Sequence, residues 1–94
     1  MQESRIPDRQ EASVKLVAYE RDAQEEQAAR RALDCGELVT YASTHGYAYL
    51  WLEGARYYAE VWCHQAPTRL YDNADLGKLL NALYRDWPDE GFAW

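Results

Sequence analysis

Three runs of β-branched and aromatic residues fill the middle of the chain, at residues 38–43, 47–52 and 56–63. Two short breaks separate them, residues 44–46 and 53–55, and each break contains a glycine. Runs of this composition are typical of strands, and short glycine-bearing breaks are typical of tight hairpins. The pattern predicts a three-stranded antiparallel β-meander, and the rest of the fold must pack around it.

The segment before the meander, residues 9–34, is rich in residues that favour helices. Asp8 and Glu11 have the spacing of a box in which two side chains satisfy the first backbone donors of a helix. Gly36 suits the end of that helix, because glycine readily adopts the left-handed conformation found there. We therefore predict an N-terminal helix, most firmly over residues 22–34.

Residues 13–19 allow a second interpretation, because their apolar and polar side chains alternate as in a strand. Their apolar positions also miss the helical stripe formed by Ala28, Ala29, Ala32 and Leu33. A helix over the whole segment is our first prediction, and a strand over residues 13–19 is the alternative.

A second helix is predicted after the meander. Asp72 or Asn73 would cap its start, and it would run to about Arg85. Residues 69–71 would add a short edge strand before it. One apolar stripe runs along this helix and contains Leu76, Leu79, Leu80, Leu83 and Tyr84. The predicted fold class is α+β in the order α-β-β-β-α, with β-α-β-β-β-α as the alternative.

The length of 94 residues is that of one domain, so we predict a single domain over residues 1–94. Residues 1–7 are polar and end in a proline, and we expect a short mobile leader there. Residues 86–94 mix acidic side chains with large aromatic ones, and we expect an acidic-aromatic tail.

Hairpin pairing sorts the side chains of the meander into two faces, because a two-residue turn pairs odd-numbered with even-numbered positions. The aliphatic face carries Val39, Tyr41, Ala48, Leu50, Leu52, Tyr57, Ala59, Val61 and Cys63. The aromatic face carries Thr40, Ala42, Tyr47, Tyr49, Trp51, Arg56, Tyr58, Glu60 and Trp62. We expect the leucines of the second helix to pack on the aliphatic face.

The aromatic face needs a cover, because monomeric proteins rarely expose a contiguous apolar patch of many hundreds of Å². We predict that the N-terminal helix lies over or beside this face. A second copy of the chain or a foreign partner is the alternative cover.

No set of residues in the sequence has the spacing of an active site. Cys35, His45, Cys63 and His64 are candidate zinc ligands, but they lack the spacing of known zinc motifs. The chain contains neither a phosphate-binding loop nor a dinucleotide-binding fingerprint. We predict a non-enzymatic protein that uses no metal and no cofactor.

The formal net charge of −6 and the isoelectric point of about 4.8 bear on the choice of partner. They disfavour direct binding to nucleic acids or to anionic membranes, both of which need clustered basic residues. A protein with a basic surface is the electrostatic complement. No apolar stretch approaches the roughly twenty residues that cross a bilayer, and the first residues lack a secretory signal. We expect a cytoplasmic protein.

These observations predict a small acidic protein-binding module that inhibits a basic, nucleic-acid-handling protein. Phage and bacterial proteins of the anti-CRISPR, anti-restriction and nuclease-immunity kinds share this general character, without any common motif. Two alternatives are a homo-oligomeric accessory or structural subunit, possible as a homodimer, and a binder of small ligands or single-stranded RNA. The predicted binding residues are Tyr47, Tyr49, Trp51, Arg56, Tyr58 and Trp62 on the aromatic face, with Asp86, Asp89, Glu90 and Trp94 as a second patch.

Overall fold

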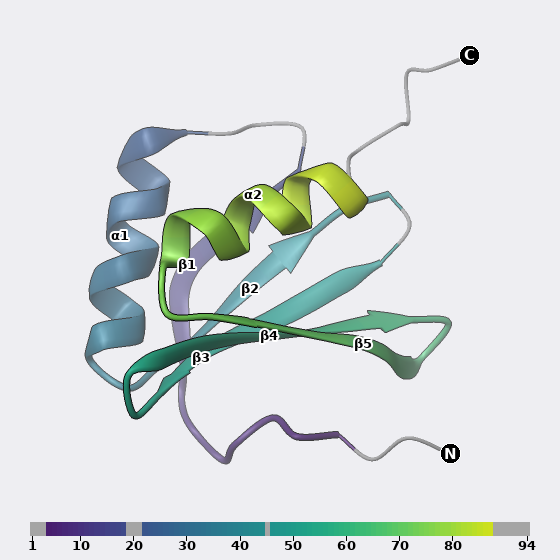
Figure 1. Cartoon of the computed structure of the whole chain (residues 1–94), viewed down its shortest axis with the longest axis horizontal. Coiled ribbons are helices and arrows are strands. Elements are labelled where there is room, and N and C mark those ends of the chain that lie inside the picture. Colours follow the sequence, from purple (N-terminus) through teal and green to yellow (C-terminus); the bar gives the residue numbers. More distant parts are fainter. Residues whose placement is uncertain (1–3, 19–21, 45, 88–94) are drawn as a thin grey trace.

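The computed structural model describes residues 4–18, 22–44 and 46–87, and its elements follow the order β-α-β-β-β-β-α (Figure 1). The α+β class is confirmed, but the sheet has five strands rather than three. The strands lie in sequence order across the sheet. They are β1 (Glu11–Val17), β2 (Leu38–Ala42), β3 (Tyr47–Glu53), β4 (Arg56–Cys63) and β5 (Ala66–Asn73), and the helices are α1 (Ala23–Asp34) and α2 (Leu76–Asp86).

The first strand corrects the prediction of a single long N-terminal helix. Residues 11–17 form β1, which pairs with β2 in parallel, with Leu16 opposite Tyr41. The strand reading of this segment is right because alternation places Leu16 in the core, and pairing with a distant strand overrides helix propensity. Helix α1 begins only at Ala23. Its cap is Asp22 rather than the predicted box at Asp8, and the Asp22 carboxylate accepts a 2.8 Å bond from the Gln24 amide.

The meander of β2, β3 and β4 is confirmed, and so are its two faces. Leu50 lies opposite both Val39 and Ala59, as the predicted pairing of odd with even positions requires. Glu53 lies opposite Arg56, so that a two-residue turn joins β3 to β4. The first residue of that turn is Gly54, whose φ of 63° lies in the left-handed region that glycine adopts without strain.

Strand β5 is longer than the predicted edge strand at residues 69–71, because Ala66 and Pro67 also pair with β4, past a register shift at Thr68. The connection from β4 shrinks to His64 and Gln65, with φ values of 55° and 64°. A two-residue hairpin turn with both central residues left-handed matches the twist of the flanking strands. Neither residue is glycine, so this turn carries backbone strain.

Replacing Gln65 with glycine is therefore expected to stabilise the fold by about 0.5–1 kcal/mol. The left-handed conformation costs a non-glycine residue about 1–2 kcal/mol, partly offset by the greater freedom of glycine in the unfolded chain. Urea denaturation measures the difference. Glu53→Gly, at the end of a regular strand, serves as the control and should destabilise by about 0.5–1 kcal/mol; equal effects of both changes would contradict the explanation.

Both helices pack on the aliphatic face of the sheet (Figure 1). The predicted leucine stripe of α2 is buried there, and residues Ala29, Ala32 and Leu33 of α1 join the same core. Helix α2 is capped by Asp75 rather than by Asp72 or Asn73. The prediction that the first helix covers the aromatic face is wrong, because its small and apolar stripe completes the core on the opposite side. No helix within the described ranges is long and apolar enough to span a membrane.

Candidate binding face

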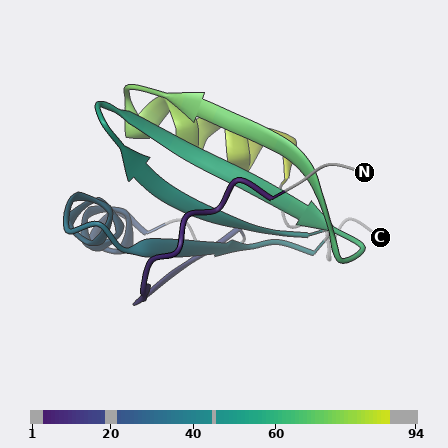
Figure 2. The same ribbon diagram turned by 90° about the horizontal axis from the view of Figure 1, so that it is seen from below.

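The aromatic face lies on the side of the sheet away from both helices. Figure 2 shows the chain before β1 running across this side, over strands in the middle of the sheet. In the described part of the chain, residues 4–9 take the position that the sequence assigned to the first helix. We call residues 4–9 the strap.

The strap is fixed to the aromatic face at two points. At one point, the hydroxyl of Ser4 and the backbone N–H of Arg5 donate to the Glu60 carboxylate over 2.8 and 2.6 Å. At the other point, the Arg9 guanidinium donates to the carbonyl of Leu52 over 2.5 Å. Residues 4–7, expected to belong to a mobile leader, thus make defined contacts with the sheet, while residues 1–3 lie outside the described part.

Glu60 is the centre of the first attachment point. It is only 3% exposed, and it is the one buried charged residue in the described part of the chain. Besides the two donors of the strap, the indole Nε1–H of Trp62 donates to the same carboxylate over 2.8 Å. Three donors on one carboxylate are what allow an acidic side chain to be buried in a sheet face.

Trp51 lies on the same face, in register between the two attachment points of the strap, and is only 2% exposed. Its ring stacks on Tyr58 with a centroid separation of 5.6 Å and an angle of 14° between the planes. Trp51 adjoins the Leu52 attachment point in β3, and its cross-strand partner Tyr58 lies two residues from Glu60. The indole N–H of Trp51 is buried without a hydrogen-bond acceptor. An unsatisfied buried donor costs about 1–3 kcal/mol, so the burial of Trp51 leaves one polar group of the face uncompensated.

Tyr47, Tyr49 and Trp62 form a continuous aromatic cluster at the end of the face beyond the strap. Tyr47 stacks on Trp62 at 6.3 Å and meets Tyr49 edge to face at 5.6 Å. Tyr47 is 39% exposed, the larger of the two exposed fractions found among big apolar side chains in the described residues. This cluster presents rigid aromatic surface with polar edges, the composition of protein-binding hot spots.

Two open hollows flank this cluster. The smaller one, of about 330 Å³, lies between Ile6 of the strap and the three aromatic rings. The larger one, of about 760 Å³, adds polar groups to the tyrosines. Its lining includes Glu11, Lys15, Thr40, Ser43, Thr44, Gly46 and His64. Burial, together with the nearby Tyr47 and the negative charge of Glu11, raises the pKa of Tyr49 above its usual value.

The remaining predicted residues of this face lie farther from the cluster. Arg56 forms an exposed ion pair with Asp72 of β5 at 2.9 Å, a contact that stabilises little in water. Tyr58 is half-buried beside Trp51. The predicted residues of this face thus fall into three groups. They are the aromatic cluster around Tyr47, the stacked rings of Trp51 and Tyr58, and Arg56 in its ion pair with Asp72.

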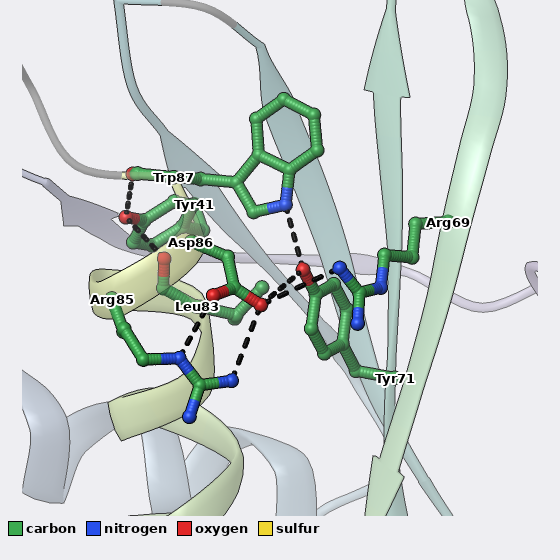
Figure 3. A network of polar contacts seen from close by, with 7 residues as sticks. All are labelled: Tyr41, Arg69, Tyr71, Leu83, Arg85, Asp86 and Trp87. Carbon is green, nitrogen blue, oxygen red and sulfur yellow. Dashed lines mark hydrogen bonds and ion pairs between the residues drawn. The ribbon is translucent and has the colours of Figure 1, made fainter.

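The second predicted patch is represented only by Asp86, since Asp89, Glu90 and Trp94 lie outside the described residues. The Asp86 carboxylate already has partners within the chain (Figure 3): Tyr71 donates over 3.0 Å, and Arg85 and Arg69 form ion pairs with it. Trp87 donates in turn to the Tyr71 hydroxyl over 2.8 Å. This network joins the end of α2 to β5.

The Asp86 network predicts a loss of stability in acid. The hydrogen bonds from Arg85 and Tyr71 hold the pKa of Asp86 below its ordinary value of 3.8. A carboxyl group whose pKa is lowered by folding stabilises the fold above its unfolded pKa, and this stabilisation is lost as the pH falls through the folded pKa. Asp86→Asn should therefore be less stable than the wild type at pH 7, and the difference should shrink below pH 4. Urea unfolding at pH 7 and pH 3 tests this; a constant difference would contradict it.

Metal-ligating side chains and thiols are dispersed over the described residues. Within the described ranges, no three His, Cys, Asp or Glu side chains gather where they could hold a metal ion. Cys35 is exposed at the end of α1 and Cys63 is half-buried at the end of β4, so these two thiols sit in separate surroundings.

Comparison of the chain with protein-family models, with curated proteins and with solved structures gives no match. Function therefore has to be inferred from the aromatic face itself.

The binding residues predicted from the sequence include neither the strap nor the residues of β1 that line the larger hollow. Reading residues 13–19 as a strand would have placed Lys15 on the aromatic face, because odd positions of β1 point to the side opposite Leu16, but that reading begins two residues after Glu11. No pattern in the sequence predicts where the strap lies. Its contacts join Ser4 and Arg5 to a residue more than fifty positions away.

Proposed function

We propose that this protein is a non-enzymatic binding module that attaches to a basic protein through its aromatic face and thereby antagonises it. The observation that carries the proposal is the cluster of exposed Tyr47 with half-buried Tyr49 and Trp62, on a sheet face that neither helix covers. Aromatic side chains on a rigid sheet lose little entropy on binding, which makes them effective anchors.

Charge supports the choice of a basic partner. The chain carries a formal net charge of −6, which accelerates encounter with a positively charged surface. Glu11 lines both hollows beside the cluster, whereas Lys15 lines the larger one, so the negative charge of Glu11 weighs most at the smaller hollow. A protein that handles nucleic acids is the natural class of target, because its basic binding surface is the one that an acidic antagonist would occupy.

Replacing Tyr47 with alanine is expected to weaken binding to the partner about tenfold, because it removes the most exposed ring of the cluster without opening the core. The partner is first recovered by affinity purification on the wild-type protein, and its affinity for both forms is then measured by calorimetry. A salt series should show weaker binding at higher ionic strength.

Gln27→Ala on the exposed surface of α1 is the matched control and should leave the affinity unchanged. Equal affinities for the wild type and Tyr47→Ala would refute the assignment of the aromatic face. A partner that retains its full nucleic-acid-dependent activity when saturated with this protein would refute antagonism while leaving binding intact.

The hollow of about 760 Å³ favours one second candidate, a small-ligand site beside Tyr47 and Tyr49. Its size is within the range of ligand pockets, and its lining combines tyrosine rings with polar groups that could orient a ligand. A tryptophan-fluorescence titration with nucleotides and short single-stranded oligonucleotides at low salt distinguishes this candidate, since Trp62 stacks on Tyr47 and would report an occupant. Light scattering across a dilution series likewise tests self-association through the same face.

A further inference from the structure

We propose that the part of the aromatic face beneath the strap is a binding site for an extended, basic peptide segment of a partner protein, and that residues 4–9 occupy it as an internal ligand. The inference rests on the proposed function and specifies its partner. It predicts that the partner has a flexible segment that contains an arginine. When this segment binds, it displaces the strap from the sheet face.

The first argument is the way the strap is held. None of residues 4–9 belongs to a strand, and the contacts that fix them are ones that another peptide could make. Glu60 accepts from a backbone N–H and from a hydroxyl, and the carbonyl of Leu52 accepts from a guanidinium. A segment with an arginine at the matching distance could use both attachment points.

The second argument is the charge of the strap. The strap carries Arg5 and Arg9 against one acidic residue, Asp8. The Arg9 guanidinium donates to the Leu52 carbonyl, while the buried Glu60 carboxylate accepts from the Ser4 hydroxyl and the Arg5 backbone N–H. The sheet face therefore supplies the hydrogen-bond acceptors and the strap supplies the donors. A basic segment of a partner carries the same donors, which is the chemistry expected of the target class proposed above.

The third argument is that the strap leaves two features of its site unused. The Trp51 indole N–H, which lies in register between the two attachment points, is buried with no acceptor. Next to Ile6, the hollow of about 330 Å³ remains between the strap and the aromatic cluster. A segment with a carbonyl oxygen above Trp51 and a larger apolar side chain in the hollow would complement the site better than the strap does.

The test uses the full-length protein and a fluorescein-labelled, N-acetylated peptide with the sequence of residues 4–10. In the wild type the tethered strap competes at an effective concentration on the order of a millimolar, so added peptide should bind weakly. The double variant Ile6→Glu/Arg9→Ala weakens the strap and leaves the site intact. Fluorescence anisotropy should then show binding at least about tenfold tighter than to the wild type.

Three controls make the outcome decisive. A scrambled peptide of the same composition should bind the double variant at least about tenfold more weakly. Adding Glu60→Gln to that variant should reduce the gain, because the amide oxygen accepts from fewer donors than the carboxylate. Lys78→Ala on the exposed side of α2 should change nothing. If the double variant does not unfold cooperatively, Arg9→Ala alone replaces it, with an expected gain of about threefold.

The proposal is overturned if the peptide binds wild type and strap variant equally, or if the scrambled peptide binds as well as the authentic one. The result is separable from the test of function. A recovered partner that depends on Tyr47, together with no peptide binding, rejects this site and keeps the proposed function. If the peptide binds but no basic partner can be recovered, the peptide site is kept and the proposed function is rejected.

Discussion

Replacing Trp51 with alanine is expected to destabilise the fold by about 3–5 kcal/mol, the loss typical of a large aromatic side chain removed from a packed site. Only 2% of Trp51 is exposed, and its ring stacks on Tyr58. The change leaves a cavity between the sheet and the strap that neither can easily close. Urea denaturation at pH 7, followed by circular dichroism, measures the loss.

Two companion variants locate the effect. Trp51→Phe keeps most of the stacked area and also removes the unsatisfied indole N–H, so it should cost much less than the alanine change. Tyr58→Ala removes the half-buried partner of the stack and should fall between them. A Trp51→Ala protein that keeps its stability but loses its partner would contradict the structure, because it would make Trp51 an open binding residue.

The meander could be predicted from the sequence because its signals are local. Turn residues at 44–46 and 53–55 and the alternation between them fix which residues share a face, and this assignment holds for every paired residue of β2, β3 and β4. The leucine stripe of α2 is equally local, because residues three and four apart share a helical face.

The N-terminal third could not be predicted as well, because its structure depends on distant partners. Residues 11–17 form a strand only by pairing in parallel with β2, across the whole of α1. Helix α1 in turn buries Ala29, Ala32 and Leu33 on the side that this crossover dictates. Helix propensity and the capping box predicted at Asp8 are properties of the segment in isolation. Pairing of the segment with β2 in the folded protein overrides both.

The same distinction applies to the candidate binding face. The aromatic rings follow from strand alternation, so Tyr47, Tyr49 and Trp62 lie together as expected. Which rings are open depends on the strap, and the strap depends on Glu60. Sequence alone places Glu60 on the face but gives no sign that it is buried, because its partners Ser4 and Arg5 come from the other end of the domain.

Glu60 should therefore control both stability and the cover of Trp51. Glu60→Ala is expected to destabilise the fold by about 2–4 kcal/mol, because it removes the acceptor of three donors and leaves the Trp62 indole N–H inside the face without a partner. The strap loses one of its two attachment points in the same step. The Trp51 indole N–H should then exchange with solvent faster, which NMR can follow at a single resolved signal.

Glu60→Gln separates the acceptor from the shape of the side chain. Its amide oxygen can still accept from one or two donors, so it should cost about half as much as alanine while also weakening the strap. Leu70→Ala is a control at the position paired with Glu60 on β5, where the side chain is 38% exposed, and it should leave Trp51 protected. If Glu60→Ala remains as stable as the wild type and its Trp51 indole stays protected, the strap is held by other contacts, and Glu60 is not its anchor. If both stability and the protection of Trp51 fall, Glu60 stabilises the sheet and also holds the strap over the binding face. The reason is that its carboxylate accepts hydrogen bonds from Trp62 and from the strap at the same time.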